Sequence, residues 1–177
     1  MKKFSFANPT AFLMAIVIIS FIFIPQTYAD NEKRLAILPF EMISADDITY
    51  IQSGILQMLH SRLVWKDHVI VVTKKVVAEQ AGRIDSQKTN LLIKKIAELT
   101  DSDYVLSGNI IQFSNAFSID AKIYDIKNKQ YLTVFEQSNK IDDIIPKLNI
   151  IAAKINKKVF DRKTIVYTQI EKEEKEK

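Results

Sequence analysis

The residue types that most often carry enzyme chemistry are sparse in this chain of 177 residues. It contains two histidines, His60 and His68, and no cysteine. The lack of cysteine excludes cysteine nucleophiles, disulfides and thiolate metal sites. The two histidines could form a proton shuttle or a metal pair, but neither has a motif partner at ligand spacing. Structural or surface roles are therefore the favoured interpretation for both.

Paired carboxylates occur at two places in the sequence. Asp101 and Asp103 bracket Ser102, and this spacing could hold a divalent cation. The same residues are typical of a turn between a helix and a strand, which is the interpretation we favour. Asp46 and Asp47 precede an apolar helical pattern, where carboxylates cap the helix and favour its dipole. Neither pair predicts a metal site.

Motifs for phosphate or acyl chemistry are absent from the sequence. Three glycines in 177 residues leave no room for a phosphate-binding glycine loop. There is also no Gly-x-Ser-x-Gly nucleophile elbow. The sequence therefore predicts no catalytic residue, no metal and no cofactor, and a hydrolase or other enzyme is the least favoured hypothesis.

Basic and aromatic residues lie together at Tyr124, Lys127, Lys129 and Tyr131, a combination that could track nucleic acid. The formal net charge of +4, however, comes from lysines and glutamates that are interspersed rather than clustered. We therefore expect a solvated surface and no nucleic-acid partner. Trp65 could belong to a binding platform, but an aromatic residue near a helix end more often closes a core.

The first 29 residues have the layout of a secretory signal peptide. After a basic start, residues 11–24 are apolar and uncharged, and Thr27 and Ala29 place small side chains before a cleavage site at Asp30. A helix that spans a membrane needs about 20 apolar residues, and this run is shorter. We therefore expect a mature chain that begins at Asp30, lies in the periplasm and has no integral membrane span. A retained signal that acts as an anchor is the alternative.

The elements that follow the signal predict a parallel unit in the first half of the chain. Apolar runs at 34–40 and 69–72 are typical of central strands covered on both faces, and residues 48–63 between them have helical spacing. Such a crossover is expected to be right-handed. Gly54 lies inside that helix, where we expect it to permit close packing on the sheet. Two further helices are expected at 74–80 and 87–99.

The second half predicts an antiparallel meander and a final helix. Strands are expected at 104–113, 117–124 and 131–136, and the middle one alternates apolar and polar residues. The last helix has an apolar stripe that includes Leu148, Ala152 and Ile155, which we expect to cover the sheet.

Together these elements give the order β-α-β-α-α-β-β-β-α. The predicted fold class is α/β, with a single mixed five-stranded sheet and helices packed on it. The predicted organisation is a signal peptide at 1–29, one domain at 30–162, and a charged, disordered tail at 163–177.

Three stretches together resemble the TolB amino-terminal-like α/β domain family. They are RLAILPFE at 34–41, SDYVLSGNI at 102–110 and FSIDAKIYDIKNKQ at 117–130. The family pattern has an apolar strand that ends in Leu-Pro-Phe, then a helix, then Asp-Tyr-Val-Leu-x-Gly. The resemblance covers roughly residues 34–160.

The resemblance implies a periplasmic binding or assembly domain without a catalytic set. Proteins with this domain include envelope proteins of the Tol system, flagellar outer-membrane assembly proteins and the curli secretion lipoprotein. The domain also resembles the front part of secreted proteins with an FG-GAP propeller. This chain departs from these patterns, because no propeller follows Phe160 and no cysteine offers a lipid anchor.

The last strand of the meander is the predicted partner-binding site. As an edge strand, it offers unpaired backbone groups to an extended segment of a partner through Tyr131, Thr133 and Phe135. Thr133 and Phe135 are expected on the opposite face from Leu132 and Val134. The alternative is a plain edge, protected by the charges of Lys129 and Glu136 at its ends.

The sequence thus favours a periplasmic, non-catalytic binding or assembly module that docks a protein partner of the cell envelope. A subunit of an outer-membrane secretion or appendage-assembly complex is the alternative.

Overall fold

A computed structural model describes residues 32–44, 49–82 and 89–176. The predicted signal peptide, its cleavage site and the predicted capping residues Asp46 and Asp47 lie outside the described residues. No helix within the described part of the chain is both long and apolar enough to cross a bilayer.

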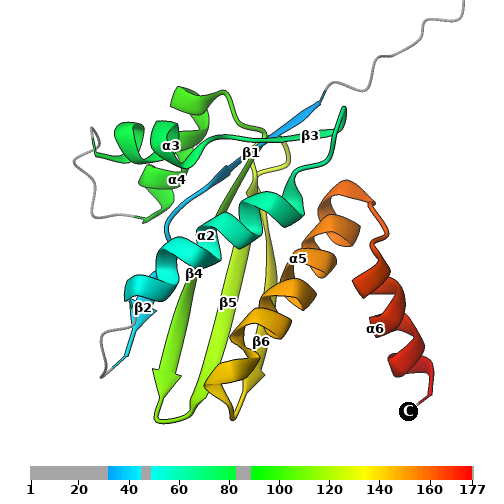
Figure 1. The fold of residues 1–177 in the computed structure, drawn as a ribbon. Coiled ribbons are helices and arrows are strands. Elements are labelled where there is room, and N and C mark those ends of the chain that lie inside the picture. Colours follow the sequence, from blue (N-terminus) through cyan, green and yellow to red (C-terminus); the bar gives the residue numbers. More distant parts are fainter. Residues whose placement is uncertain (1–31, 45–48, 83–88, 177) are drawn as a thin grey trace, which may run out of the picture. The chain divides into compact units, whose positions relative to one another are not determined.

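The described chain from residue 32 onward forms a mixed α/β structure (Figure 1). The sheet has the strand order β3-β1-β4-β5-β6, with β1 parallel to β3 and β4, and β4, β5 and β6 antiparallel. The predicted fold class is therefore confirmed. In chain order, the elements are β1 Lys33–Ile37, β2 Glu41–Ile43, α2 Thr49–Leu63, β3 Val69–Val71, α3 Lys74–Ala81, α4 Thr89–Thr100, β4 Tyr104–Phe113, β5 Ala116–Asp125, β6 Gln130–Ser138, the 3-10 turn η1 Ile141–Asp143, α5 Ile144–Phe160 and α6 Ile165–Lys175.

A sixth strand, β2, is an addition to the predicted sheet. It continues the line of β1 and pairs in parallel with β4. Ile37 lies opposite Leu106, and Glu41 lies opposite Asn109. The segment from β1 to β2 therefore advances four residues where β4 advances three. The extra residue falls at Leu38-Pro39-Phe40, where proline lacks the N–H that a ladder needs. The sequence indicated a stop at Pro39 but not the restart after it.

The contact between Phe40 and Gly108 explains why the two family-like stretches occur together. The Phe40 ring is fully buried against Gly108. A Cβ atom at Gly108 would lie 2.5 Å from Phe40 Cε1 and 2.3 Å from the Asp120 carbonyl oxygen. Only glycine leaves room for this ring, so the Leu-Pro-Phe segment and the glycine of β4 form one structural unit.

Helices cover the two faces of the sheet unequally (Figure 1). Helices α2 and α5 pack on one face, in the core that contains Leu35, Ile37 and the buried side chains of β4, β5 and β6. Helices α3 and α4 pack on the other face, but their core reaches only Ala36, Leu38 and the start of β4 with Tyr124. The prediction that Leu148, Ala152 and Ile155 of α5 cover the sheet is confirmed, since all three are buried in the core between the sheet and helices α2 and α5.

Two expectations from the sequence are wrong. Gly54 is exposed, and a Cβ atom there would meet nothing within 4 Å, so it does not permit close packing. The segment predicted as a disordered tail at 163–177 contains α6, which packs on α5. Its N-cap, Thr164, accepts a hydrogen bond from the Tyr167 N–H, and Lys163 forms an ion pair with Glu171. Lysine and glutamate are good helix formers, which the prediction of disorder underestimated.

Candidate docking site at the edge of β6

Strand β6 is an edge of the sheet, as predicted. It pairs with β5 along one side, and no strand of the described residues pairs with its other side. Nine residues make this the longest strand at either end of the order, because β3 at the opposite end has three. An unpaired edge of this length presents a row of free backbone donors and acceptors.

The hydrogen-bond pattern identifies which residues of β6 point their backbone groups outward. The Leu38 N–H donates to the Leu106 carbonyl oxygen over 2.8 Å, so Leu106 faces β1 and not β5. Because backbone groups alternate in direction along an antiparallel ladder, the register through β5 transfers this parity to β6. The residues of β6 with outward backbone groups are Tyr131, Thr133, Phe135 and Gln137.

The side chains of the same residues lie on the face away from α5. Tyr131, Thr133 and Phe135 are exposed, with Phe135 at 62%. Val134 between them is 3% exposed, and Leu132 packs against the core of α2 and α5. The predicted division of β6 into two faces is therefore confirmed, and the predicted site residues share one face.

Sequence reasoning missed two further apolar side chains on this open face. Phe113 at the end of β4 is 79% exposed, and Ile43 of β2 is 46% exposed. Ile43 pairs with Ile111, two residues before Phe113 on β4, so both point to the side opposite the core residue Ile110. Alternation along β4 could have placed Phe113, whereas Ile43 required knowledge of β2.

The charges that were expected to guard the edge do not both lie there. Glu136 points toward α5, where its carboxylate pairs with Lys147 Nζ at 3.1 Å and Lys154 Nζ at 2.6 Å. Its side chain is only 12% exposed. Glu136 therefore stabilises the packing of α5 on β6 and leaves the outward backbone groups beside it without a carboxylate from this residue.

Tyr131 is held in place more firmly than its neighbours along the edge. Its hydroxyl donates to Asn90 Oδ1 of α4 over 2.8 Å, and its ring contacts Tyr124 with centroids 4.7 Å apart. Burial, and then the nearby Tyr124, raise the pKa of the Tyr131 phenol above its usual value. The phenol therefore remains a neutral hydrogen-bond donor at physiological pH, and Thr133 and Phe135 are the freer part of the site.

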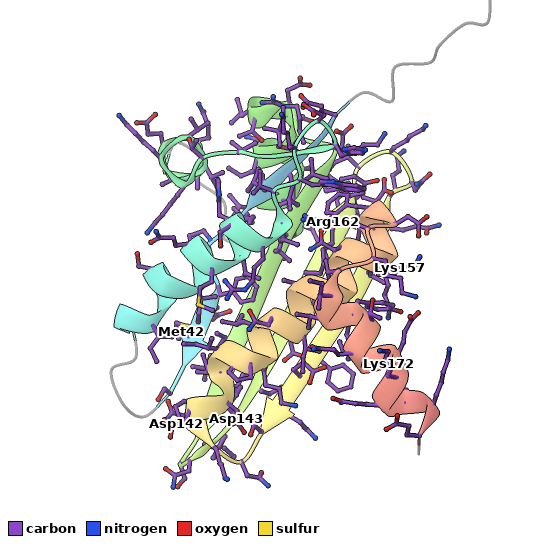
Figure 2. All side chains as sticks on the ribbon, turned by 45° about the vertical axis from the view of Figure 1, so that its right-hand side comes forward. Met42, Asp142, Asp143, Lys157, Arg162 and Lys172 are labelled. Atoms are coloured by element: carbon purple, nitrogen blue, oxygen red, sulfur yellow. The ribbon has the colours of Figure 1, made fainter. Side chains whose placement is uncertain are left out.

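The other side chains that the sequence offered as catalytic, metal-binding or aromatic binding groups have structural contacts in the fold. His68 stacks on Trp65 with ring centroids 3.9 Å apart, and the Arg162 guanidinium lies 5.3 Å from the same Trp65 ring. Figure 2 shows Arg162 at the C-terminal end of α5, so this cluster joins α5 to the turn after α2. Asp103 Oδ2 accepts a hydrogen bond from the Arg34 N–H over 2.8 Å. That bond ties β1 to the start of β4.

Metal ligands do not gather anywhere in the described part of the chain, where no group of three or more histidine, aspartate or glutamate side chains could hold an ion. His60 lies on α2 and His68 before β3, each in its own surroundings. The structure thus does not bring the two histidines into a common site with the carboxylates.

Comparison with known proteins places the fold. No family model matches the sequence, and no curated protein matches it as a relative. Among solved structures, the chain is similar to TolB from Acinetobacter baumannii, with 18% identity and a TM-score of 0.51 over 78% of this chain. This chain has a TolB-like fold.

This chain corresponds to only part of A. baumannii TolB but to nearly the whole length of a second solved structure. The chain spans 31% of the length of A. baumannii TolB. It is also similar to the hypothetical protein CT253 from Chlamydia trachomatis, with 15% identity, a TM-score of 0.50, and coverage of 74% of this chain and 99% of that one. The resemblance predicted from the sequence is confirmed at the level of the fold.

Proposed function

We propose that this chain is a periplasmic, non-catalytic docking module of the cell envelope. It captures an extended segment of a partner protein by adding that segment to the sheet as a strand beside β6. The observation that carries the proposal is the nine-residue edge strand β6, whose outer side pairs with no strand of the described residues. Its outward backbone groups and exposed side chains coincide at Tyr131, Thr133 and Phe135.

Backbone hydrogen bonds supply the affinity in this mode of binding, and side chains on one face supply the choice of partner. The partner segment would lie along Tyr131 to Gln137, a length of about 20 Å at the usual rise of a strand. Phe135, which is 62% exposed, offers the largest apolar contact to that segment. We therefore expect a partner with an apolar side chain at the position opposite Phe135.

The signal-like first 29 residues and the TolB-like fold support an envelope location for this activity. The alternative role in a secretion or appendage complex would use the same edge.

The proposal is tested with two substitutions at one position. Thr133→Pro removes an outward N–H, whereas Thr133→Val keeps that N–H and the branched shape of the side chain. Each purified variant is used to capture envelope proteins from the native host, with thermal unfolding as a check on the fold. We expect Thr133→Pro to lose capture of the partner and Thr133→Val to keep it.

Equal capture by a folded Thr133→Pro variant would contradict docking at this edge. Should Thr133→Pro unfold, Phe135→Lys is the second variant. It replaces the apolar contact of a docked segment with a charged side chain and leaves the backbone hydrogen bonds between β5 and β6 unchanged. Capture that survives Phe135→Lys at the wild-type level would likewise exclude the β6 site.

A further inference from the structure

A cavity of about 280 Å³ opens between α2 and α3, on the side of the molecule away from β6. Its floor is formed by three buried apolar side chains, those of Ile37, Leu56 and Val72. Ile37 ends β1, and Val72 directly follows β3, so the cavity lies at the carboxyl ends of two parallel strands. That crevice is where open α/β sheets generally bind their ligands.

The rim of the cavity is polar and contains no acidic side chain among the described residues that line it. Its polar members are Ser53, Gln57, His60, Thr73 and Lys74. Lys74 Nζ donates to Ser53 Oγ over 3.0 Å, and no carboxylate of the described chain forms an ion pair with it. The cavity thus combines an apolar floor with one ammonium group that has no carboxylate partner among residues 32–44, 49–82 and 89–176.

The start of α3 adds to the positive character of this rim. Thr73 is its N-cap residue but makes no capping hydrogen bond with its side chain, and the first turn contains no acidic residue. The first bond back to the N-cap is from the Val77 N–H to the Thr73 carbonyl oxygen, at 3.2 Å. The earlier N–H groups of the helix therefore have no partner within it and favour an anion.

We propose that this cavity binds a small organic carboxylate that carries a branched aliphatic group. The carboxylate pairs with Lys74 Nζ and the start of α3, and the aliphatic group packs on Ile37, Leu56 and Val72. A volume of about 280 Å³ is at the small end of ligand sites, which suits one aliphatic side chain and its carboxylate. The same chemistry occurs in a free branched-chain acid and at the C-terminal leucine of a peptide.

The test titrates the purified protein with 4-methylpentanoate and with its neutral amide, followed by two-dimensional amide NMR. We expect saturable shifts at Ser53 and Lys74, with a dissociation constant in the millimolar range and at least about tenfold weaker binding of the amide. The proposal would be overturned if the amide signals did not shift at about 20 mM acid, or if the acid and the amide bound equally well.

Two lysines next to each other provide the matched variants. Lys74→Met removes the ammonium group at the rim and is expected to weaken binding of the acid by about tenfold or more. Lys75→Met is the control, because Lys75 is 86% exposed and pairs with Glu79 instead. Unchanged binding by a folded Lys74→Met variant would overturn the proposal, and the comparison of acid with amide on the unaltered protein stands even if that variant fails to fold.

A third titration identifies the source of the carboxylate. N-acetyl-Gly-Gly-Leu presents the same group at the end of a peptide. Tighter binding of this peptide than of the free acid assigns the cavity to the C-terminus of a protein, and weaker binding assigns it to a free branched-chain acid. Both outcomes support a carboxylate site, and neither depends on docking at β6.

Discussion

At the scale of single residues, two of the three glycines of this chain have opposite meanings. Gly108 lies under a fully buried phenylalanine ring, whereas Gly54 is exposed on α2, where an added Cβ atom would meet nothing within 4 Å. In a helix interior, glycine lowers the free energy of unfolding by about 1 kcal/mol relative to alanine. Replacing glycine with alanine is therefore unfavourable only where a neighbouring group occupies the space that the added methyl group would need. The same substitution should therefore change stability in opposite directions at the two positions.

Gly108→Ala should destabilise the protein by about 1–3 kcal/mol or more, as expected for overpacking of a rigid core. The added methyl group would meet the Asp120 carbonyl oxygen as well as the Phe40 ring. Urea denaturation of the variant and the parent measures the difference. If Gly108→Ala unfolded at the urea concentration of the parent, the close packing of Phe40 on Gly108 would be wrong.

Gly54→Ala should stabilise the protein by about 1 kcal/mol, because it removes backbone freedom from the unfolded chain and adds no contact. The same urea series gives the value, and Gly108→Ala is its matched control. A loss of stability in Gly54→Ala would contradict the open surroundings of this glycine.

At the scale of elements, the parts of the fold with a strong internal pattern could be predicted from the sequence. Alternation identified β5, and the apolar stripe identified α5, because each pattern is local to its own element. Strand β2 could not be found this way, since its three residues form a strand only through β4, more than sixty residues later. The contact between Phe40 and Gly108 is equally remote in sequence, and the motif alone showed only that the two segments occur together.

The candidate site divides along the same line. The edge position of Tyr131, Thr133 and Phe135 followed from the order of a meander, which is a local property of the chain. The cavity between α2 and α3 did not follow, because it is formed by β1, α2 and α3 together. Glu136 was assigned to the edge for its place in β6, but its partners on α5 became visible only in the tertiary structure.

Helix α6 is expected to be an accessory to the fold. It packs on α5 yet has no buried residue, and Ile165 at its start is 82% exposed. Figure 2 places Lys172 on this helix.

Deletion of residues 163–177, which contain α6, should therefore lower the free energy of unfolding by no more than about 1 kcal/mol, measured by thermal unfolding. Ile155→Ala is the positive control, because that side chain is fully buried on the sheet and its truncation should cost about 2–5 kcal/mol. A larger loss from the deletion than from Ile155→Ala would make α6 part of the core.

At the scale of the whole molecule, the two proposed sites lie at opposite ends of one sheet. The edge of β6 is at one end of the strand order, and the cavity is next to β3 and β1 at the other. The shared core of α2 and α5 runs between them. A binding module can therefore engage an extended segment at β6 while a small carboxylate occupies the cavity, since no residue lines both.

The first 29 residues carry the prediction of the compartment in which these sites would meet their ligands. The apolar run at 11–24 and the small residues Thr27 and Ala29 predict cleavage before Asp30. We expect the protein from the periplasmic fraction to have a mass that corresponds to a start at Asp30, measured by intact mass spectrometry. Ala29→Leu is the matched variant, because a large side chain at the last position before cleavage should block processing and leave the longer chain in the membrane fraction. A chain that begins at Met1 in the wild-type membrane fraction would instead make the segment a retained anchor, and the edge of β6 would then meet its partner at the membrane surface.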